Sequence, residues 1–211
     1  MTGRILHIDA SPRGERSRSR AVAQRYIDAV IARTPGASVE RLDVWSVPLP
    51  PLGEGMIESR YALIHGQPVA DEHAAAWDRV AGIVRHFLSF DHYVISTPMW
   101  NFGIPYALKH YVDVITQPGM TFGNDAEGNV TGLAAGRSAA LVVSSAMPIS
   151  DDGPLAAYDF QLTYLRQWLG FIGVTDIRTF RVAPTFGTPE QVDAVTAMAL
   201  EAAEAASSPF E

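Results

Sequence analysis

Residues 91–98 read DHYVISTP and residues 138–144 read SAALVVS. Both are short, almost continuously apolar runs of strand length, and Pro98 ends the first of them. A strand that is apolar on both faces is typical of a parallel sheet covered by helices on both sides, whereas a half-exposed strand alternates apolar and polar residues. The two segments therefore predict an α/β fold.

Strands and helices alternate on either side of these segments. Further strands are expected at 4–9, 37–43 and 174–180, and apolar residues at helical spacing predict helices at 19–32, 74–89, 104–115, 155–169 and 189–206. Thr188 is placed to cap the last helix. The connection 46–71 is rich in Pro and Gly and has room for a short helix at 56–64. The pattern predicts five strands alternating with five helices in one doubly wound domain, residues 1–211.

Composition excludes several classes of protein. The chain has 211 residues, no Cys, a formal net charge of −7 and 47% hydrophobic residues. The absence of Cys rules out disulfide scaffolds, thiolate zinc sites and Cys nucleophiles, and the apolar fraction is too high for a disordered chain. The acidic balance argues against a sequence-independent grip on nucleic acid. No apolar run is long enough for a membrane span and no signal sequence is recognisable, so a soluble cytoplasmic protein is expected.

The sequence contains no recognisable motif for metal binding or for catalysis by a side chain. His86 and His92 lie six residues apart and no His-Glu-x-x-His run occurs, so no metal site is expected. The sequence has no Gly-x-Ser-x-Gly elbow, so the usual setting of a hydrolase nucleophile is missing. The run DDGP at 151–154 is interpreted as a turn that caps the following helix rather than as a pair of catalytic carboxylates.

The loop after the first strand reads SPRGERSRS at residues 11–19 and leads into a helix. Ligands of doubly wound sheets bind beyond the carboxyl ends of the strands, and the amides and dipole of a helix N-terminus favour an anion there. Three Ser hydroxyls add neutral donors, and four guanidinium groups lie nearby, those of Arg13, Arg16, Arg18 and Arg20. This chemistry suits a phosphate monoester. The alternative is that Ser17 or Ser19 only caps the helix while the Arg side chains are solvated.

The loop after the third strand reads PMWNFGIP at residues 98–105. It gathers apolar and aromatic residues where a solvent-facing turn is usually polar. Such a wall suits a flat ring system whose polar edge meets backbone amides. The alternative is that Trp100 and Phe102 pack beneath the edge of the sheet.

The chain resembles the FMN-dependent NADH:azoreductase family. The resemblance rests on Pro-Met-x-Asn-Phe-x-Ile-Pro at 98–105, Leu-Lys-x-Tyr-x-Asp at 108–113, Gly-x-Thr-Phe at 119–122, Asp-Gly-Pro at 152–154, LGFIGVTD at 169–176, and the spaced Ser11, Ser17 and Ser19. It implies a flavodoxin-like fold with a five-stranded parallel sheet of order 2-1-3-4-5 and helices on both faces. It also implies a homodimer with FMN in a cleft at the subunit interface.

The resemblance assigns residues to that cleft. The FMN phosphate would be held by Ser11, Ser17, Arg18 and Ser19, with Arg18 standing where relatives often have Gln. The ribityl chain and the isoalloxazine would be lined by Pro98, Met99, Trp100, Asn101 and Phe102. Ser144 and Ser145 would face the pyrimidine edge, in a loop that departs from the family because SSAM at 144–147 replaces the frequent Ser-Arg-Gly-Gly. Arg60 and Phe122 would contact the substrate, whereas Trp168 is interpreted as a core residue.

The activity implied is the reduction of quinones and azo compounds with NADH or NADPH. A hydride would pass through flavin N5 in two successive steps at one site, and no side chain would act as a catalytic residue, because the flavin carries the chemistry. Two other functions stay open. One is an electron carrier of the flavodoxin type, with a partner protein in place of a substrate. The other is a binding module that has lost the cofactor, which only the altered 144–147 loop supports.

Overall fold

The computed structural model describes residues 3–206 and 208–210. Five parallel strands form its central sheet: β1 (Arg4–Asp9), β2 (Ser38–Asp43), β3 (His92–Pro98), β6 (Ser138–Ser144) and β7 (Asp176–Val182). Their order across the sheet is β2-β1-β3-β6-β7, which reads 2-1-3-4-5 when these five strands alone are numbered along the chain. β3 and β6 are buried along almost their whole length, as their continuously apolar sequences predicted.

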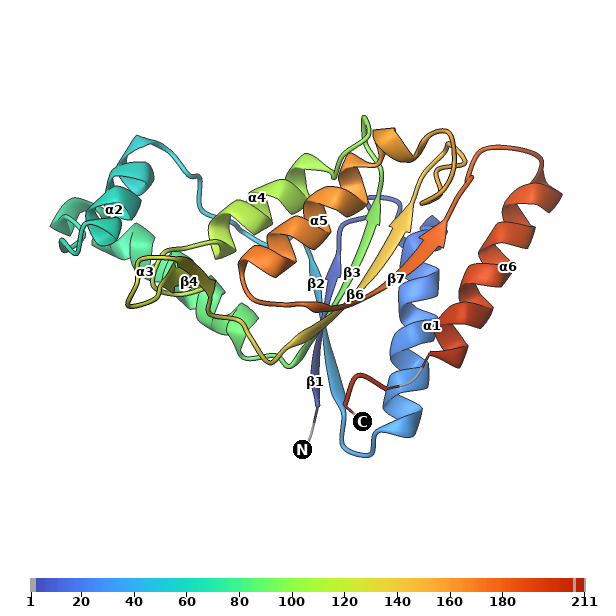
Figure 1. The fold of residues 1–211 in the computed structure, drawn as a ribbon, viewed down its shortest axis with the longest axis horizontal. Coiled ribbons are helices and arrows are strands. Elements are labelled where there is room, and N and C mark those ends of the chain that lie inside the picture. Colours follow the sequence, from blue (N-terminus) through green and yellow to red (C-terminus); the bar gives the residue numbers. More distant parts are fainter. Residues whose placement is uncertain (1–2, 207, 211) are drawn as a thin grey trace.

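Helices cover both faces of the sheet (Figure 1). α1 (Arg18–Arg33) and α6 (Pro189–Ala205) lie on one face, where they pack against Val94 and Val142 of the sheet. α3 (Asp71–Leu88), α4 (Tyr106–Ile115) and α5 (Phe160–Phe171) cover the other face, around Ile95 and Leu141. Full burial of one such aliphatic side chain stabilises a fold by about 1.5–3 kcal/mol. The two cores therefore hold the sheet from both sides.

Most predicted helix boundaries lie within about three residues of those in the structure. Thr188 caps α6 in a capping box: its hydroxyl accepts from the Gln191 amide, and the Gln191 side chain accepts from the Thr188 amide. The predicted start of α5 at residue 155 was wrong, because residues 156–158 form a separate 3-10 turn. The 151–154 turn does not cap this helix. Its cap is Asp159, whose carboxylate accepts from Leu162 N.

Two features depart from the predicted count of five strands and five helices. In the described part of the chain, a sixth helix, α2 (Glu54–Ile64), lies in the 46–71 connection where a short helix was expected. The antiparallel hairpin of β4 (Phe122–Asn124) and β5 (Val130–Gly132) was not predicted, because three-residue strands show little periodicity. A search of the described residues finds no helix with the length and hydropathy needed to cross a membrane.

The carboxyl ends of β1, β3 and β6 meet at one edge of the sheet, at the top of Figure 1. Two backbone hydrogen bonds join the segments at that edge, from Ala10 N to Ser96 O at 2.8 Å and from Met99 N to Ser144 O at 2.7 Å. The topology therefore brings the two loops singled out in the sequence, and the loop after Ser144, to one place.

Candidate functional site

The loops beyond β1, β3 and β6, with the segment after β7, enclose a cavity of about 210 Å³. Its lining combines Ser and Arg residues of the β1–α1 segment with apolar residues of the loop after β3. The lining residues are Ser11, Arg13, Ser17, Arg18, Pro98, Met99, Trp100, Ser144, Ala146 and Thr185. Three of them, Arg13, Ala146 and Thr185, were not among the predicted contacts.

A larger cavity, of about 540 Å³, lies between β2 and α3 and is lined by residues that include Leu42 and Ile83. It shares no lining residue with the smaller cavity. Ligands of doubly wound sheets bind beyond the carboxyl ends of the strands. The smaller cavity is therefore the candidate site in spite of its size.

The β1–α1 loop passes through one 3-10 turn, Gly14–Arg16, before α1 begins. Ser17 is the N-cap of α1: its Oγ accepts a hydrogen bond from Arg20 N at 3.2 Å and lies 3.3 Å from Ser19 Oγ. Ser17 also lines the cavity, whereas Ser19, which is 1% exposed, does not. Capping is compatible with anion binding, because one cap leaves the other first-turn amides, those of Arg18 and Ser19, as donors.

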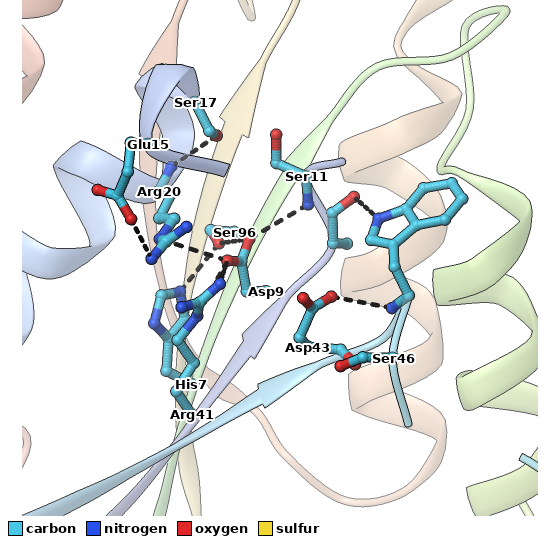
Figure 2. Close-up of polar contacts among 12 residues, drawn as sticks. His7, Asp9, Ser11, Glu15, Ser17, Arg20, Arg41, Asp43, Ser46 and Ser96 are labelled. Atoms are coloured by element: carbon cyan, nitrogen blue, oxygen red, sulfur yellow. Dashed lines mark hydrogen bonds and ion pairs between the residues drawn. The ribbon is translucent and has the colours of Figure 1, made fainter. Parts of the chain in front are cut away.

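A buried carboxylate that the sequence analysis did not single out lies behind this loop (Figure 2). Asp9 is 1% exposed and accepts hydrogen bonds from Arg41 Nε and Nη2 at 3.1 and 2.7 Å. Ser96 Oγ donates to it at 3.3 Å, and Arg20 Nε lies 3.5 Å away. Its Oδ1 also accepts from Ser11 N at 3.2 Å. These charge-assisted contacts offset the cost of burying a carboxylate, and they fix Ser11 in the cavity wall.

His7 belongs to the same cluster, with Nε2 2.9 Å from Ser96 Oγ (Figure 2). Burial lowers the pKa of His7 to about 4, although the neighbouring Asp9 carboxylate opposes this change. The ring is therefore neutral at pH 7. Within RILHID at 4–9, His7 and Asp9 belong to no motif, so the sequence offered no signal for this cluster.

The loop after β3 makes a tight turn over residues 100–103. Trp100 N donates to Gly103 O at 2.9 Å and Gly103 N donates to Trp100 O at 3.0 Å, and φ is 48° at Asn101 and 70° at Phe102. Positive φ is uncommon for residues other than Gly, and such strain is concentrated at functional sites. Trp100 and Phe102 are 39% and 40% exposed, so the alternative that they pack beneath the sheet edge was wrong. The side chains of Asn101 and Phe102 do not line the cavity.

Trp100 connects the cavity to two further aromatic rings. Its ring centroid lies 5.5 Å from that of Trp45 and 6.2 Å from that of Tyr106. The Trp45 indole N–H donates to Ala10 O at 3.1 Å, which ties the β2–α2 connection to the loop after β1. Trp45 therefore contacts both Trp100, which lines the cavity, and the loop after β1.

The loop after β6 contributes one of its two predicted residues to the lining. Ser144 lines the cavity. Ser145 does not, because its hydroxyl donates to Met147 O at 2.7 Å and its carbonyl accepts from Thr185 N at 2.8 Å. Ala146 and Thr185 line the cavity in its place. Thr185 follows β7, where the sequence showed no motif.

The two predicted substrate residues lie together, outside the cavity lining. The Arg60 guanidinium on α2 is 6.0 Å from the centroid of the Phe122 ring on β4, and that ring packs against Phe171 with centroids 4.9 Å apart. Trp168 is 6% exposed and donates from Nε1 to Thr116 Oγ1 at 2.9 Å. Its interpretation as a core residue is confirmed.

The residues of the cavity fit a flat ring system with a phosphate group. Among the described residues, the Arg13 guanidinium and the Ser144 hydroxyl make no hydrogen bond or ion pair with the protein, so both can bind a ligand. The α1 N-terminus and the Ser hydroxyls suit an oxyanion, and Pro98, Met99 and Trp100 suit an apolar ring. In the same part of the chain, no group of three His, Cys, Asp or Glu side chains is placed to hold a metal ion.

Comparisons with known proteins agree with this chemistry. A family model described as a flavodoxin-like fold matches residues 3–206. The chain is 42% identical over 200 residues to an FMN-dependent NADH:quinone oxidoreductase of Nitratidesulfovibrio vulgaris, with 94% of this chain and 95% of the relative covered. It is 37% identical over 203 residues to FMN-dependent NADH:quinone oxidoreductase 2 of Pseudomonas syringae pv. tomato, with 96% and 97% covered.

A solved structure gives the same result. The azoreductase of Bacillus anthracis is 26% identical to this chain, with a TM-score of 0.84 over 96% of this chain and 97% of that one. The fold is thus flavodoxin-like. The chain belongs to the flavodoxin-like family, in the group that contains FMN-dependent NADH:quinone oxidoreductases and azoreductases.

Proposed function

We propose that this protein is an FMN-dependent oxidoreductase that uses NADH or NADPH to reduce quinones and azo compounds. The observation that carries the proposal is the cavity at the sheet edge. Anion donors at the α1 N-terminus and the flat apolar surface of Trp100 lie in one cavity, as a ring system with a phosphate tail requires. Two quinone oxidoreductases, 37% and 42% identical over nearly the whole chain, support the same activity.

Bound FMN would supply the chemistry, the exchange of a hydride at its N5 atom. The residues of this chain would bind and orient it. Ser11, Ser17 and the first amides of α1 would donate hydrogen bonds to the phosphate. The Ser144 hydroxyl would donate to the pyrimidine edge of the ring. Among the described lining residues only Arg13 and Arg18 carry ionisable side chains, and both are guanidinium groups, so we expect water to supply protons.

Besides Ser145, three predicted cofactor contacts do not line the cavity through their side chains: Ser19, Asn101 and Phe102. We propose that they act through their backbone. Ser19 N lies in the first turn of α1, where amides point towards an anion. The positive φ values at Asn101 and Phe102 set the direction of the amides in the 100–103 turn, which would meet the polar edge of the ring.

We also propose that the protein is a homodimer. α2 lies at one end of the molecule, away from the sheet (Figure 1), and carries Ile57, Tyr61 and Ile64 on one face at 41%, 60% and 50% exposure. A contiguous exposed apolar stripe is typical of a protein–protein interface. If α2 docks on a second copy of the chain, Arg60 and Phe122 of one subunit would approach the cavity of the other. The chain would act as one flavin-binding domain in the cytoplasm, where NADH is formed.

Steady-state oxidation of NADH tests the activity. With FMN supplied, we expect NADH to be consumed in the presence of a soluble quinone or an azo dye and of no other protein. A flavin that binds but turns over only with an added redox protein would show an electron carrier instead. A chain that binds no FMN would be a binding module of this fold.

A further inference from the structure

Residues 13–20, which span the end of the β1–α1 loop and the first turn of α1, carry four guanidinium groups. Among the described residues, the structure pairs only two of them. Arg20 is committed to carboxylates, with Nη2 2.8 Å from Glu15 and Nε 3.5 Å from Asp9 (Figure 2). Arg18 is held at the surface of α6, where its Nη1 lies 3.2 Å from Asp193 Oδ1 and 2.9 Å from Thr196 Oγ1. The charges of these two guanidinium groups are thus already paired within the protein.

Arg13 and Arg16 are different. Within residues 3–206 and 208–210, neither side chain makes a hydrogen bond or an ion pair. Of these two residues, Arg13 lines the cavity beside Ser11 and Ser17, whereas Arg16 is exposed at the end of the 3-10 turn and does not line it. Arg13 is therefore the residue of this loop that both lines the cavity and has an unpaired guanidinium.

Asp9 explains why Arg20 does not share this role. A carboxylate that is 1% exposed needs cationic partners, and it takes both Arg41 and Arg20. Ser11 N donates to the same carboxylate, so this interaction also sets the position of the loop. The ion pairs of Asp9 with Arg41 and Arg20 stabilise the fold behind the loop, and they do not involve Arg13.

A phosphate monoester carries about −1.5 to −2 charges at pH 7. Ser hydroxyls and backbone amides donate hydrogen bonds to it but carry no charge, and the chain as a whole has a formal net charge of −7. A charge-assisted hydrogen bond is roughly twice as strong as a neutral one. An unpaired guanidinium at the cavity therefore distinguishes a phosphorylated ligand from a neutral one of the same shape.

We infer that Arg13 is the residue that makes this site selective for the phosphorylated flavin, FMN, over riboflavin. Its guanidinium pairs with the phosphate, whereas Arg16, Arg18 and Arg20 contribute little to the choice. The inference rests on the proposed function, because it takes FMN as the ligand. It goes beyond that function by assigning the discrimination between the two flavins to one side chain.

The test is a titration of the apoprotein with FMN and with riboflavin, followed by flavin fluorescence. The variants are Arg13→Gln and Arg16→Gln, which remove one unpaired exposed charge each from the same loop, and Arg13→Lys, which keeps the charge. We expect Arg13→Gln to weaken FMN binding by about 10- to 100-fold, with riboflavin binding changed less than about threefold. Arg16→Gln should bind FMN as the unaltered protein does, and Arg13→Lys should recover part of the loss. Salt should weaken FMN binding less in Arg13→Gln than in the unaltered protein.

Two outcomes would overturn the inference while the proposed function stands. Arg13→Gln could bind FMN with unchanged affinity, or it could lose FMN and riboflavin to the same extent, which would show a structural role for Arg13. An unaltered protein that binds neither flavin would contradict the proposed function itself. Circular dichroism and the thermal midpoint of each variant establish that the exposed substitution leaves the fold intact.

Discussion

Trp100 and Gly103 exchange two backbone hydrogen bonds, of 2.9 and 3.0 Å, and so close the turn that carries the aromatic end of the cavity. The two residues between them have positive φ, 48° at Asn101 and 70° at Phe102. Asn tolerates this left-handed region, but Phe does not, and a non-Gly residue there costs roughly 1–2 kcal/mol. The turn therefore holds Phe102 in a strained conformation beside the proposed site.

Comparison of Phe102→Gly with Phe102→Ala tests this strain. Both variants remove the ring, which is 40% exposed and packs on Tyr158 with centroids 5.4 Å apart. Only Gly adopts φ near 70° without a steric penalty, so we expect the Gly variant to be the more stable by about 1 kcal/mol in urea unfolding. Both variants keep the backbone amide, and the Phe102 side chain does not line the cavity, so we expect FMN affinity to change little in either. An Ala variant at least as stable as the Gly variant would show that the turn is not strained at Phe102.

The buried carboxylate of Asp9 gives a second prediction. Asp9→Asn leaves the Arg41 guanidinium without its charge partner and leaves Arg20 paired with Glu15 alone. Arg41 is 40% exposed, so solvent recovers part of the loss. We expect the free energy of unfolding to fall by about 2 kcal/mol. The matched control is Glu204→Gln, which breaks the exposed Arg25–Glu204 pair of 2.7 Å and should cost less than about 0.5 kcal/mol. Equal losses in the two variants would contradict a structural role for the Asp9 cluster.

His92 predicts how stability changes with pH. Its side chain is fully buried, with Nε2 3.1 Å from Tyr26 Oη and Nδ1 2.8 Å from Ser138 Oγ. Burial, with a smaller effect of the Arg178 charge, lowers the pKa of His92 to about 3, from 6.5 for an unperturbed ring. Between these values the unfolded chain binds a proton that the folded chain does not. The free energy of unfolding therefore falls as the pH falls, by up to about 1.4 kcal/mol per pH unit.

Urea unfolding at several pH values between 7 and 5 measures the contribution of His92 to the pH dependence of stability. The neutral variant His92→Gln should be less stable at pH 7, because it disturbs the two buried hydrogen bonds, and its stability should depend less steeply on pH. His65→Gln, which removes an exposed ring, is the control for the loss of a His residue as such. His7 acts in the same direction through its own lowered pKa, so some pH dependence should persist. A slope unchanged in His92→Gln would contradict the assignment.

The exposed stripe on α2 predicts the effect of breaking the proposed dimer. Ile57→Asp combined with Tyr61→Asp places two charges on that stripe, where both side chains are largely exposed in one chain. We expect a monomer by analytical ultracentrifugation, with a lower kcat/KM for quinones, because the partner would complete the site. Met198→Asp on α6, at a side chain that is 69% exposed, is the control and should stay dimeric. A double variant that remains dimeric would place the interface elsewhere.

The sequence predicted the fold well because its central strands are unambiguous. DHYVISTP and SAALVVS are apolar on both faces, and only a sheet covered on both sides buries them. Thr188 was recognisable as a cap because its hydroxyl and the amide three residues on form a local motif. The hairpin of β4 and β5 and the late start of α5 depend on short segments and on one cap, Asp159, so local patterns did not reveal them.

The candidate site was only partly predictable, for a similar reason. Ser11, Ser17 and Met99 lie in motifs of the segments that follow β1 and β3, and the structure places all three on the cavity. Thr185 reaches the cavity only because β7 ends beside β6, and Asp9 is important only because Arg41 of the neighbouring strand faces it. Such contacts depend on the register between strands. These contacts could therefore not be predicted from the single sequence before the fold was known.

On the proposed function, this chain binds FMN and passes a hydride from a nicotinamide cofactor to a quinone. The visible spectrum of the purified protein under nitrogen, with FMN supplied, tests it most directly. We predict that the flavin bands of the bound cofactor are lost when NADH is added and return when a quinone follows. A bound flavin whose spectrum NADH leaves unchanged, or a chain that binds no FMN, would contradict the account.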